Sequence, residues 1–309
     1  MTAMTAVTVR VPAKVNLQLA VGPAREDGYH DLVNVFHAVS VFDEVTVTAR
    51  EPGSAPGEII LRVTGETGSG PTRVPDDTSN LAVRAAAVLA HETGAGTPIT
   101  IDLHKNIPVA GGMAGGSADA AATLVACDTL WKTGMAQQDL LDLAARLGSD
   151  VAFPLLGRTA LGTGRGEVLE PLPCGGGLHW VFALAEGGLS TGEVFRAYDR
   201  LRPDAPQPQC DPALVAALAS GDAAAVGAAL DNDLQRAAVS LRPELSHTLA
   251  VGEEAGALGT LVSGSGPTCA FLAADERDAQ RIAARLLEAG RCARTITAYG
   301  DVPGASVVS

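Results

Sequence analysis

Alternating apolar and polar residues dominate the N-terminal segment and predict β-strands. Residues 7–11 and 15–21 alternate or run apolar on either side of Pro12. Because proline cannot donate to a strand ladder, we expect two strands with a break at this residue. Asp27-Gly28 is a turn signal, and residues 33–47, rich in β-branched side chains, predict a further strand. The chain therefore begins as a β-rich segment.

After this segment the pattern alternates between short apolar runs and longer stretches rich in alanine and leucine. Up to residue 172 it predicts a strand at 58–63, a helix at 80–92, a strand at 99–103, helices at 117–131 and 137–147, and a glycine-containing hairpin at 159–172. Gly148 follows the third of these helices, in the position where a left-handed residue commonly ends a helix. The mixture of strands and helices predicts an α+β fold.

A change of composition at residues 171–177, Pro-Leu-Pro-Cys-Gly-Gly-Gly, predicts the boundary between two domains, 1–172 and 173–309. A chain of 309 residues is longer than a single hydrophobic core usually serves, which supports the division. Beyond the boundary the pattern predicts a strand at 179–184, helices between 211 and 238, a helix at 243–254, strands at 259–262 and 268–271, a helix at 276–289 and a strand at 294–299. Without the inserted helices this order is β-α-β-β-α-β, the ferredoxin-like arrangement.

The strongest chemical signal is the glycine-rich segment Pro108-Val109-Ala110-Gly111-Gly112-Met113-Ala114-Gly115-Gly116-Ser117-Ala118. Its glycines let the backbone approach a ligand closely, and the helix expected from Ser117 directs free amides and a positive dipole end at the loop. Such an arrangement binds phosphate, and the Ser117 hydroxyl can ligate a magnesium ion that bridges phosphates. The segment lacks the lysine of a P-loop and the spacing of the dinucleotide fingerprint. A flexible linker before a helix is the alternative interpretation.

The negative net charge of the chain makes the glycine-rich segment more significant as a binding site for an anionic ligand. The formal net charge is −13, so the chain repels nucleic acid and anionic lipid, and we expect neither as a partner. An anionic nucleotide must then be held by local groups that overcome the overall field. Only three lysines are present, Lys14, Lys105 and Lys132.

Cysteine usage and the absence of long apolar runs predict the compartment. The five cysteines are scattered and form no CxxC pair, which argues against a disulfide framework or a zinc site and favours a reducing compartment. No apolar run reaches the length of a membrane span, and residues 1–9 lack the pattern of a signal peptide. We therefore predict a cytoplasmic protein, whereas the sequence carries no signal for an oligomeric state.

Residues 108–120 resemble the central motif of the GHMP kinases, a superfamily named for galactokinase, homoserine kinase, mevalonate kinase and phosphomevalonate kinase. Residues 12–17, Pro-Ala-Lys-Val-Asn-Leu, resemble its first motif, and residues 263–267, Ser-Gly-Ser-Gly-Pro, its third. Singly, these two segments read as a strand with an exposed lysine and as a hairpin turn. Three motifs in this order identify the chain as a member of the superfamily. The resemblance implies an ATP- and Mg²⁺-dependent kinase with a ribosomal-protein-S5-like N-terminal domain and a ferredoxin-like C-terminal domain.

The resemblance also implies two catalytic residues, Lys14 and Asp150. Lys14 and Asn16 alternate with apolar residues, so both face one side of a strand. Asp150 is implied to be the base that accepts the proton of the acceptor hydroxyl, and Lys14 beside it would keep the carboxylate ionised. From local sequence alone, Asp150 is equally an N-cap for a short turn at 151–153.

Residues 25–32, which contain Asp-Gly-Tyr-His, resemble those members of the superfamily that phosphorylate a cytidine diphosphate sugar alcohol. Matches to the same members follow at residues 79–81, 147–151 and 232–234. The resemblance implies a substrate-binding set in which two aromatic rings stack on cytosine, a histidine binds its edge and two asparagines contact the substrate: Tyr29, Phe195, His30, Asn16 and Asn80.

Alternatives to this substrate remain at the level of the sequence. Tyr29 is also compatible with packing beside a turn, and His30 with a solvent-facing position. The chain is alternatively another GHMP kinase, of the homoserine or mevalonate type, which needs no cytidine-stacking tyrosine. A catalytically silent protein of the same fold is a further alternative, and the joint presence of Lys14, Ser117 and Asp150 argues against it.

Overall fold

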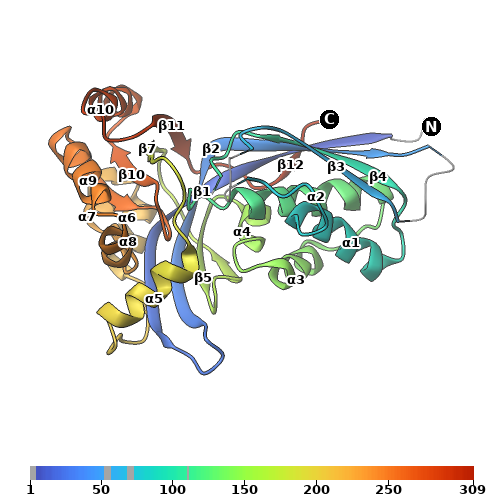
Figure 1. Cartoon of the computed structure of the whole chain (residues 1–309), viewed down its shortest axis with the longest axis horizontal. Coiled ribbons are helices and arrows are strands. Elements are labelled where there is room, and N and C mark those ends of the chain that lie inside the picture. Colours follow the sequence, from blue (N-terminus) through green and yellow to red (C-terminus); the bar gives the residue numbers. More distant parts are fainter. Residues whose placement is uncertain (1–4, 52–56, 68–72, 110) are drawn as a thin grey trace.

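The computed structural model describes residues 5–51, 57–67, 73–109 and 111–309, and two β-sheets organise them (Figure 1). The larger sheet has the spatial order β12-β1-β2-β4-β3, with β5 on β2, β6 on β5 and β8 on β1. Its strands are β1 (Ala6–Ala24), β2 (His30–Ala49), β3 (Ile59–Gly65), β4 (Ile99–Lys105), β5 (Thr159–Thr163), β6 (Val168–Pro171), β8 (Asp231–Asn232) and β12 (Ser306–Val307).

A single long strand, β1, replaces the two strands that the sequence predicts around Pro12. Pro12 lies opposite Phe42 on β2, and the next residue, Ala13, lies opposite Val39, so the ladder shifts its register at the proline. Such an irregularity accommodates the missing N–H without ending the strand. The predicted break at Pro12 was therefore wrong.

Helices α1 (Leu81–Thr93), α2 (Gly115–Trp131), α3 (Gln137–Leu147) and α4 (Ala152–Leu156) lie together beside the larger sheet (Figure 1). The alanine-rich α2 is the most deeply placed, because small side chains such as Ala120 and Ala121 are fully buried in the core. It begins at Gly115, earlier than predicted. Gly148 after α3 has φ 175°, which is extended backbone, so the predicted left-handed stop was wrong.

The smaller sheet has the order β11-β7-β10-β9, and its strands are β7 (Leu178–Leu184), β9 (Gly259–Val262), β10 (Cys269–Ala273) and β11 (Arg294–Gly300). With α9 (Glu244–Glu254) and α10 (Glu276–Glu288), these strands confirm the predicted ferredoxin-like order. Four helices are inserted between β7 and α9: α5 (Thr191–Leu201), α6 (Pro212–Ser220), α7 (Ala223–Ala228) and α8 (Gln235–Leu241). Of these, α5 was not predicted.

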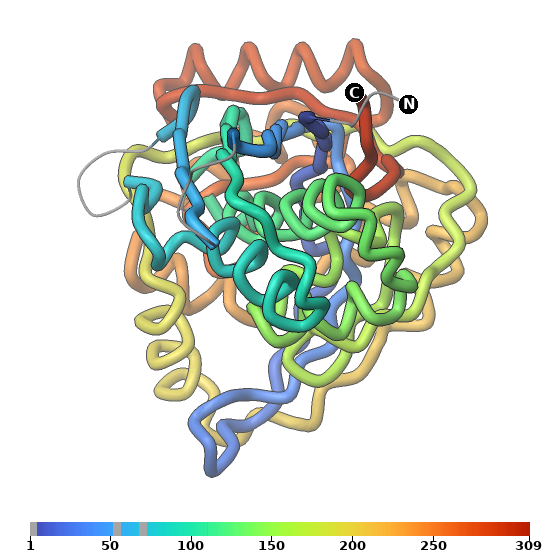
Figure 2. Tube along the Cα trace, turned by 90° about the vertical axis from the view of Figure 1, so that its right-hand side faces the viewer, coloured from blue at the N-terminus to red at the C-terminus, as the bar shows by residue number. Residues whose placement is uncertain are grey.

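Both halves of the chain contribute strands to the larger sheet. The short strand β8 pairs in parallel with β1, and β12 pairs antiparallel with it, so two strands of the C-terminal half complete the larger sheet. The division at 172/173 stays a prediction. Figures 1 and 2 both place α5 beside the end of the β1–β2 hairpin, far from α10. Within the described ranges, no helix is long and apolar enough to cross a membrane.

Candidate active site

The three segments that resemble superfamily motifs meet in space. The backbone N–H of Lys14 on β1 donates to the carbonyl of Met113 at 3.3 Å, and the Ser263 hydroxyl donates to the carbonyl of Gly112 at 3.2 Å. Gly112 has φ 72°, and a Cβ there would lie 2.1 Å from the Ser263 carbonyl oxygen, so only glycine fits. A Cβ at Gly264 would lie 3.5 Å from the Lys14 Nζ. Residues from both halves of the chain thus build one junction.

Asn232, at the end of β8, holds the third of these segments in place. Its Nδ2 donates to the carbonyls of Val262 at 2.7 Å and Gly264 at 2.8 Å, and its Oδ1 accepts from the N–H of Leu234 at 2.9 Å. The amide side chain is buried, so these bonds satisfy most of its capacity. Asn232 therefore fixes the backbone that packs against the glycine-rich loop.

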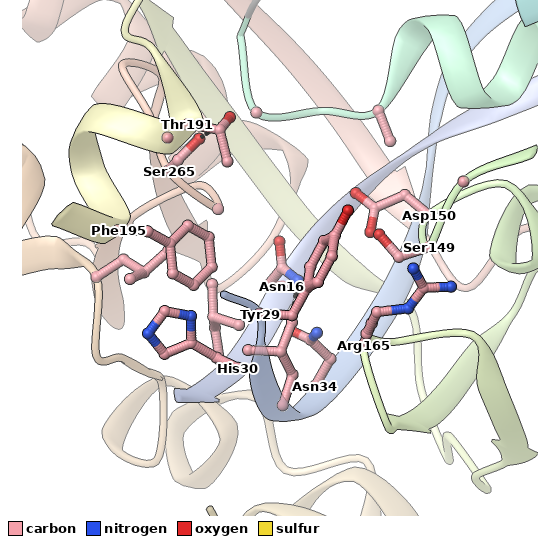
Figure 3. Close-up of a pocket in the computed structure, with 18 of the residues that line it drawn as sticks. Asn16, Tyr29, His30, Asn34, Ser149, Asp150, Arg165, Thr191, Phe195 and Ser265 are labelled. Atoms are coloured by element: carbon pink, nitrogen blue, oxygen red, sulfur yellow. Dashed lines mark hydrogen bonds between the residues drawn. The ribbon is translucent and has the colours of Figure 1, made fainter. Parts of the chain in front are cut away.

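A cavity of about 880 Å³ opens beside the junction (Figure 3). It lies between the β1–β2 hairpin, the glycine-rich loop, the turn after α3, and α5. The predicted residues that line it are Lys14, Asn16, Tyr29, His30, Asp150, Phe195, Gly112 and Ala114. The structure therefore brings both predicted catalytic residues and four of the predicted substrate residues to one place.

Lys14 and Asp150 form an ion pair at this cavity, with the Lys14 Nζ 3.7 Å from the Asp150 Oδ2. Burial lowers the pKa of Lys14, and the nearby Asp150 carboxylate only partly opposes this. The same ammonium donates to the Asn16 Oδ1 at 2.6 Å, and the Asn16 Nδ2 donates to the Asn34 Oδ1 at 2.9 Å. Asn34 was not predicted. This chain of hydrogen bonds orients the ammonium toward the carboxylate.

Asp150 keeps its carboxylate available. It stands in the turn between α3 and α4, and its side chain is 37% exposed. The N-cap of α4 is Val151, and no side chain caps that helix. The alternative interpretation of Asp150 as an N-cap is therefore not supported, and the carboxylate can accept a proton from a molecule in the cavity.

Aromatic residues line the opposite end of the cavity, where α5 faces the start of β2. The His30 ring centroid lies 4.9 Å from that of Phe195 and 6.2 Å from that of Tyr198. The His30 Nε2 is 2.8 Å from the Asp199 Oδ1. Because a carboxylate only accepts hydrogen bonds, the Nε2 carries the hydrogen, and in the neutral ring the Nδ1 is left as an acceptor.

Tyr29 projects into the same cavity from the β1–β2 turn and is 55% exposed. The Arg165 guanidinium carbon lies 5.4 Å from the centre of its ring. Figure 3 shows Tyr29 between Arg165 on one side and the pair His30 and Phe195 on the other. Sequence reasoning missed Arg165 and Asp199. The signal for Asp199 is its position four residues after Phe195, on the same face of a helix.

The glycine-rich loop presents the N-terminus of α2. Ala114 before the helix is left-handed, with φ 60°, and no side chain caps the helix. Helix geometry therefore leaves the amides of Gly115, Gly116 and Ser117 without an intrahelical acceptor. The Ala118 amide donates to the Ala114 carbonyl at 2.9 Å, so it is already paired.

Other residues of the predicted phosphate-binding set are placed differently. Gly111, Met113 and Ala118 are buried, and the Ser117 residue is half-buried. Ala110 lies outside the described residues.

A second cavity of about 250 Å³ lies on the other side of the loop, lined by Pro108, Val109, Gly115 and Gly116 among others. Asn80 lines this cavity and not the larger one. Its Oδ1 accepts from the Ala82 N–H at 2.9 Å, as the N-cap of α1, and its Nδ2 donates to the Pro75 carbonyl at 2.7 Å. The structure therefore separates Asn80 from the other predicted substrate residues.

Comparisons with known proteins agree with this geometry. Residues 80–158 match the family model "GHMP kinases N terminal domain", and residues 214–292 match "GHMP kinases C terminal". A 4-diphosphocytidyl-2-C-methyl-D-erythritol kinase of Thermobifida fusca is 66% identical, covering 100% of both chains. The enzyme of the same name from Streptomyces coelicolor is 58% identical, over 98% of this chain and 99% of its own length.

Solved structures show the same fold. A crystal structure of 4-(cytidine 5'-diphospho)-2C-methyl-D-erythritol kinase is 33% identical with a TM-score of 0.75, covering 94% of this chain and 98% of its own. A homoserine kinase from Cytophaga hutchinsonii has a TM-score of 0.77 at 22% identity, covering 100% of this chain and 99% of its own, and shares the fold alone. The chain therefore belongs to the GHMP kinases and, among them, to the family of the 4-diphosphocytidyl-2-C-methyl-D-erythritol kinases.

Proposed function

We propose that this protein transfers the γ-phosphoryl group of ATP to the 2-hydroxyl of 4-diphosphocytidyl-2-C-methyl-D-erythritol, in the non-mevalonate route to isoprenoid precursors. Two relatives named 4-diphosphocytidyl-2-C-methyl-D-erythritol kinase match 100% and 98% of the chain. The observation that carries the proposal is a single cavity that has the Lys14–Asp150 pair beside the glycine-rich loop and an aromatic group at the opposite end.

ATP binds across the glycine-rich loop in this proposal. The second cavity takes the nucleoside, and the free amides at the N-terminus of α2 bind the phosphates. Gly112 and Ala114 line the larger cavity, so the terminal phosphate reaches it there. These local donors hold a triphosphate despite a formal net charge of −13.

Asp150 is the proposed base, and Lys14 stabilises charge. The carboxylate accepts the proton of the acceptor hydroxyl as that oxygen attacks the γ-phosphorus. The ammonium, 3.7 Å from the carboxylate, lies where charge develops on the transferred group. Because phosphoryl transfer passes through a loose transition state, positioning and electrostatics contribute most of the rate.

The aromatic end of the cavity selects the cytidine group. Tyr29 and Phe195 offer flat faces for a base to stack on. With its Nε2 bound to Asp199, the His30 ring presents the Nδ1 as an acceptor, which suits the exocyclic amino group of cytosine. Asp199 thus joins the substrate-binding set as a positioning residue.

Magnesium, when bound, neutralises charge on the phosphates. Among the described residues, no group of three or more His, Cys, Asp or Glu can hold a metal. A cation bound mainly by phosphates and water needs few protein ligands, and the hydroxyl of Ser117 at the start of α2 is an oxygen donor that fits this role.

A measured product tests the proposal. The protein is incubated with ATP and either 4-diphosphocytidyl-2-C-methyl-D-erythritol or the same sugar alcohol without its cytidine diphosphate group, and products are followed by phosphorus NMR. We expect phosphate on the 2-hydroxyl of the cytidylated compound only. Turnover of homoserine or mevalonate instead would identify another GHMP kinase, and no transfer to any of these acceptors would favour a silent protein.

A further inference from the structure

A buried ion cluster lies behind the glycine-rich loop, and two of its members, Lys105 and Asp119, also line the second cavity. The Lys105 Nζ donates to the Asp119 Oδ2 at 2.6 Å and also to the Asp43 Oδ2. All three side chains are buried, with 0–3% of their surface exposed. We call these residues the Lys105 cluster. They come from three elements: β2, the end of β4 and the start of α2.

The cluster joins the two ends of the loop. Lys105 is the last residue of β4, and Asp119 lies in the second turn of α2, so everything between them is the loop and its approach. The Asp43 Oδ1 accepts from the amides of Asn106 at 2.6 Å and Ile107 at 2.8 Å, the first two residues after the strand. The cluster therefore holds both the entry to the loop and its exit against β2.

Gly115 is part of this arrangement. A Cβ at Gly115 would lie 3.3 Å from the Lys105 Nζ and 3.1 Å from a methyl group of Ile107. The first residue of α2 is therefore packed closely against the Lys105 ammonium. Because Gly115 and Gly116 supply two of the free amides, a change in the position of the ammonium displaces the phosphate donors themselves.

Stability alone does not account for the cluster. Burial raises the pKa of Asp119 to about 7 against the attraction of Lys105, and the Asp43 charge adds to the rise. The Asp119 Oδ1 has no hydrogen-bond partner in the described part of the chain. An ammonium near a helix N-terminus also opposes the helix dipole. Well-packed apolar residues commonly stabilise such a position as well or better, so the cluster points to a positional role.

We propose that Asp119, acting through Lys105 and Asp43, is a positioning residue that fixes the separation between the end of β4 and the start of α2 so that the loop amides fit the phosphates of the nucleotide. This inference rests on the proposed ATP site. Without the tie between Lys105 and Asp119, the loop keeps its glycines but loses the fixed distance between its ends. The nucleotide then has to order the loop on binding, which weakens affinity.

The variant Asp119→Ala tests the tie. It leaves Lys105 paired with Asp43, so no buried charge loses its last partner. Removing a carboxylate near the phosphates would, by electrostatics alone, strengthen ADP binding. A positioning role predicts the opposite sign, so we expect ADP binding measured by titration calorimetry at pH 8 to weaken about tenfold, the size of one charge-assisted hydrogen bond.

Two further variants complete the test. Asp119→Asn keeps an oxygen that can accept from Lys105, so ADP affinity should return to within about threefold of the wild type. Asp102→Ala on the same strand β4 removes a carboxylate that is not tied to α2, and it should leave ADP affinity unchanged. Cytidine diphosphate, which binds at the other cavity, should bind all variants equally.

The outcomes are distinct. ADP affinity in Asp119→Ala that equals or exceeds that of the wild type would overturn the proposal, and so would an equal loss in Asp119→Asn. If Asp119→Ala melts below the assay temperature, Asp119→Leu, which fills the volume, replaces it with the same expectation. Failure of the wild-type protein to bind ADP would overturn the ATP site and this inference together, whereas a failed acceptor assay would leave this test intact.

Discussion

Lys14 and Lys105 are both buried, yet they lie in opposite electrostatic surroundings. Lys14 has one carboxylate nearby, Asp150 at 3.7 Å, and burial lowers its pKa despite that charge. Burial would also lower the pKa of Lys105, but Asp119 and Asp43 together outweigh it and raise the pKa. An ammonium whose charge is only partly neutralised by carboxylates can still interact strongly with a phosphate. An ammonium that is bound by two carboxylates has its charge neutralised by them. The comparison separates a lysine that has one carboxylate at 3.7 Å from a lysine that is held by two carboxylates.

The two pKa shifts have opposite signs for stability. A lysine with a lowered pKa in the folded state is protonated less readily there than in the unfolded chain, so Lys14 destabilises the fold at neutral pH. Lys105 has a raised pKa, so its contribution is fully present below pH 10.5 and is lost as pH rises through its folded pKa. Functional sites commonly keep such locally unfavourable groups.

Removing Lys105, the lysine that is bound by two carboxylates, should have the largest effect on stability. In Lys105→Met, Asp43 and Asp119 stay buried without their counter-charge, so we expect the free energy of unfolding to fall by about 3–5 kcal/mol. Urea unfolding at pH 7.5 measures this. The exposed Lys132→Met is the control and should stay close to the wild type. An unchanged midpoint in Lys105→Met would mean that the cluster does not hold ionised carboxylates.

Asp150→Asn should strongly reduce phosphoryl transfer at the Lys14–Asp150 pair. The amide cannot accept the proton of the acceptor hydroxyl, so kcat should fall by at least ~100-fold with little loss of ATP affinity. Single-turnover kinetics combined with nucleotide titration separate the two quantities. Near-normal turnover would remove Asp150 from the role of base. The melting temperature should stay close to that of the wild type, because the side chain is partly exposed.

Lys14→Ala should slow phosphoryl transfer by about 10- to 100-fold, because it removes the ammonium that stabilises negative charge on the transferred phosphoryl group. In the wild type, the rate should fall with rising pH at a value below 10.5, because Lys14 loses its proton earlier than a free lysine does. This alkaline limb should be absent from the residual rate of the variant. A retained limb would assign it to another group. Unlike Lys105→Met, Lys14→Ala should not lower the unfolding free energy by several kcal/mol.

His37 extends the comparison to a buried base that is held neutral. Burial lowers its pKa to about 3, and its Nδ1 lies 2.8 Å from the Thr159 hydroxyl oxygen. The unfolded chain binds a proton here below about pH 6.5 and the folded chain does not, so stability should fall as pH drops from about 6.5 towards 3. The effect is at most about 1.4 kcal/mol per pH unit.

The variant His37→Gln isolates this group, because its amide can still donate to Thr159 but does not titrate. We expect the slope of unfolding free energy against pH to be smaller in His37→Gln by up to one bound proton. The exposed His91→Gln should keep the wild-type slope. Equal slopes in all three proteins would show that His37 becomes protonated in the folded state.

Local features of the sequence were sufficient for much of the fold. The order of strands and helices in the ferredoxin-like part follows from periodicity, because the spacing of buried side chains in a strand or helix is a property of the local backbone. The glycine-rich loop was also recognisable from local sequence. Positions such as Gly112, which needs a positive φ, restrict the residue type locally.

Local sequence failed where neighbours in space decided the outcome. Pro12 reads as a strand break, but the register shift opposite Phe42 accommodates it. Asn80 matched a family segment, yet its place beside the second cavity depends on how α1 packs. Helix α5 was missed, and with it the contact between Asp199 and His30. Each case depends on a partner far along the chain.

The sequence by itself determined the backbone propensities, the glycine-rich loop and the residue types that are typical of a kinase. Only the tertiary structure decided which lysine faces Asp150 and which is closed in by Asp43 and Asp119. The physical reason is that the charge state and role of a buried ammonium depend on the number of carboxylates within a few ångströms. Sheet register and helix packing set that number, and nothing next to the lysine in the chain does.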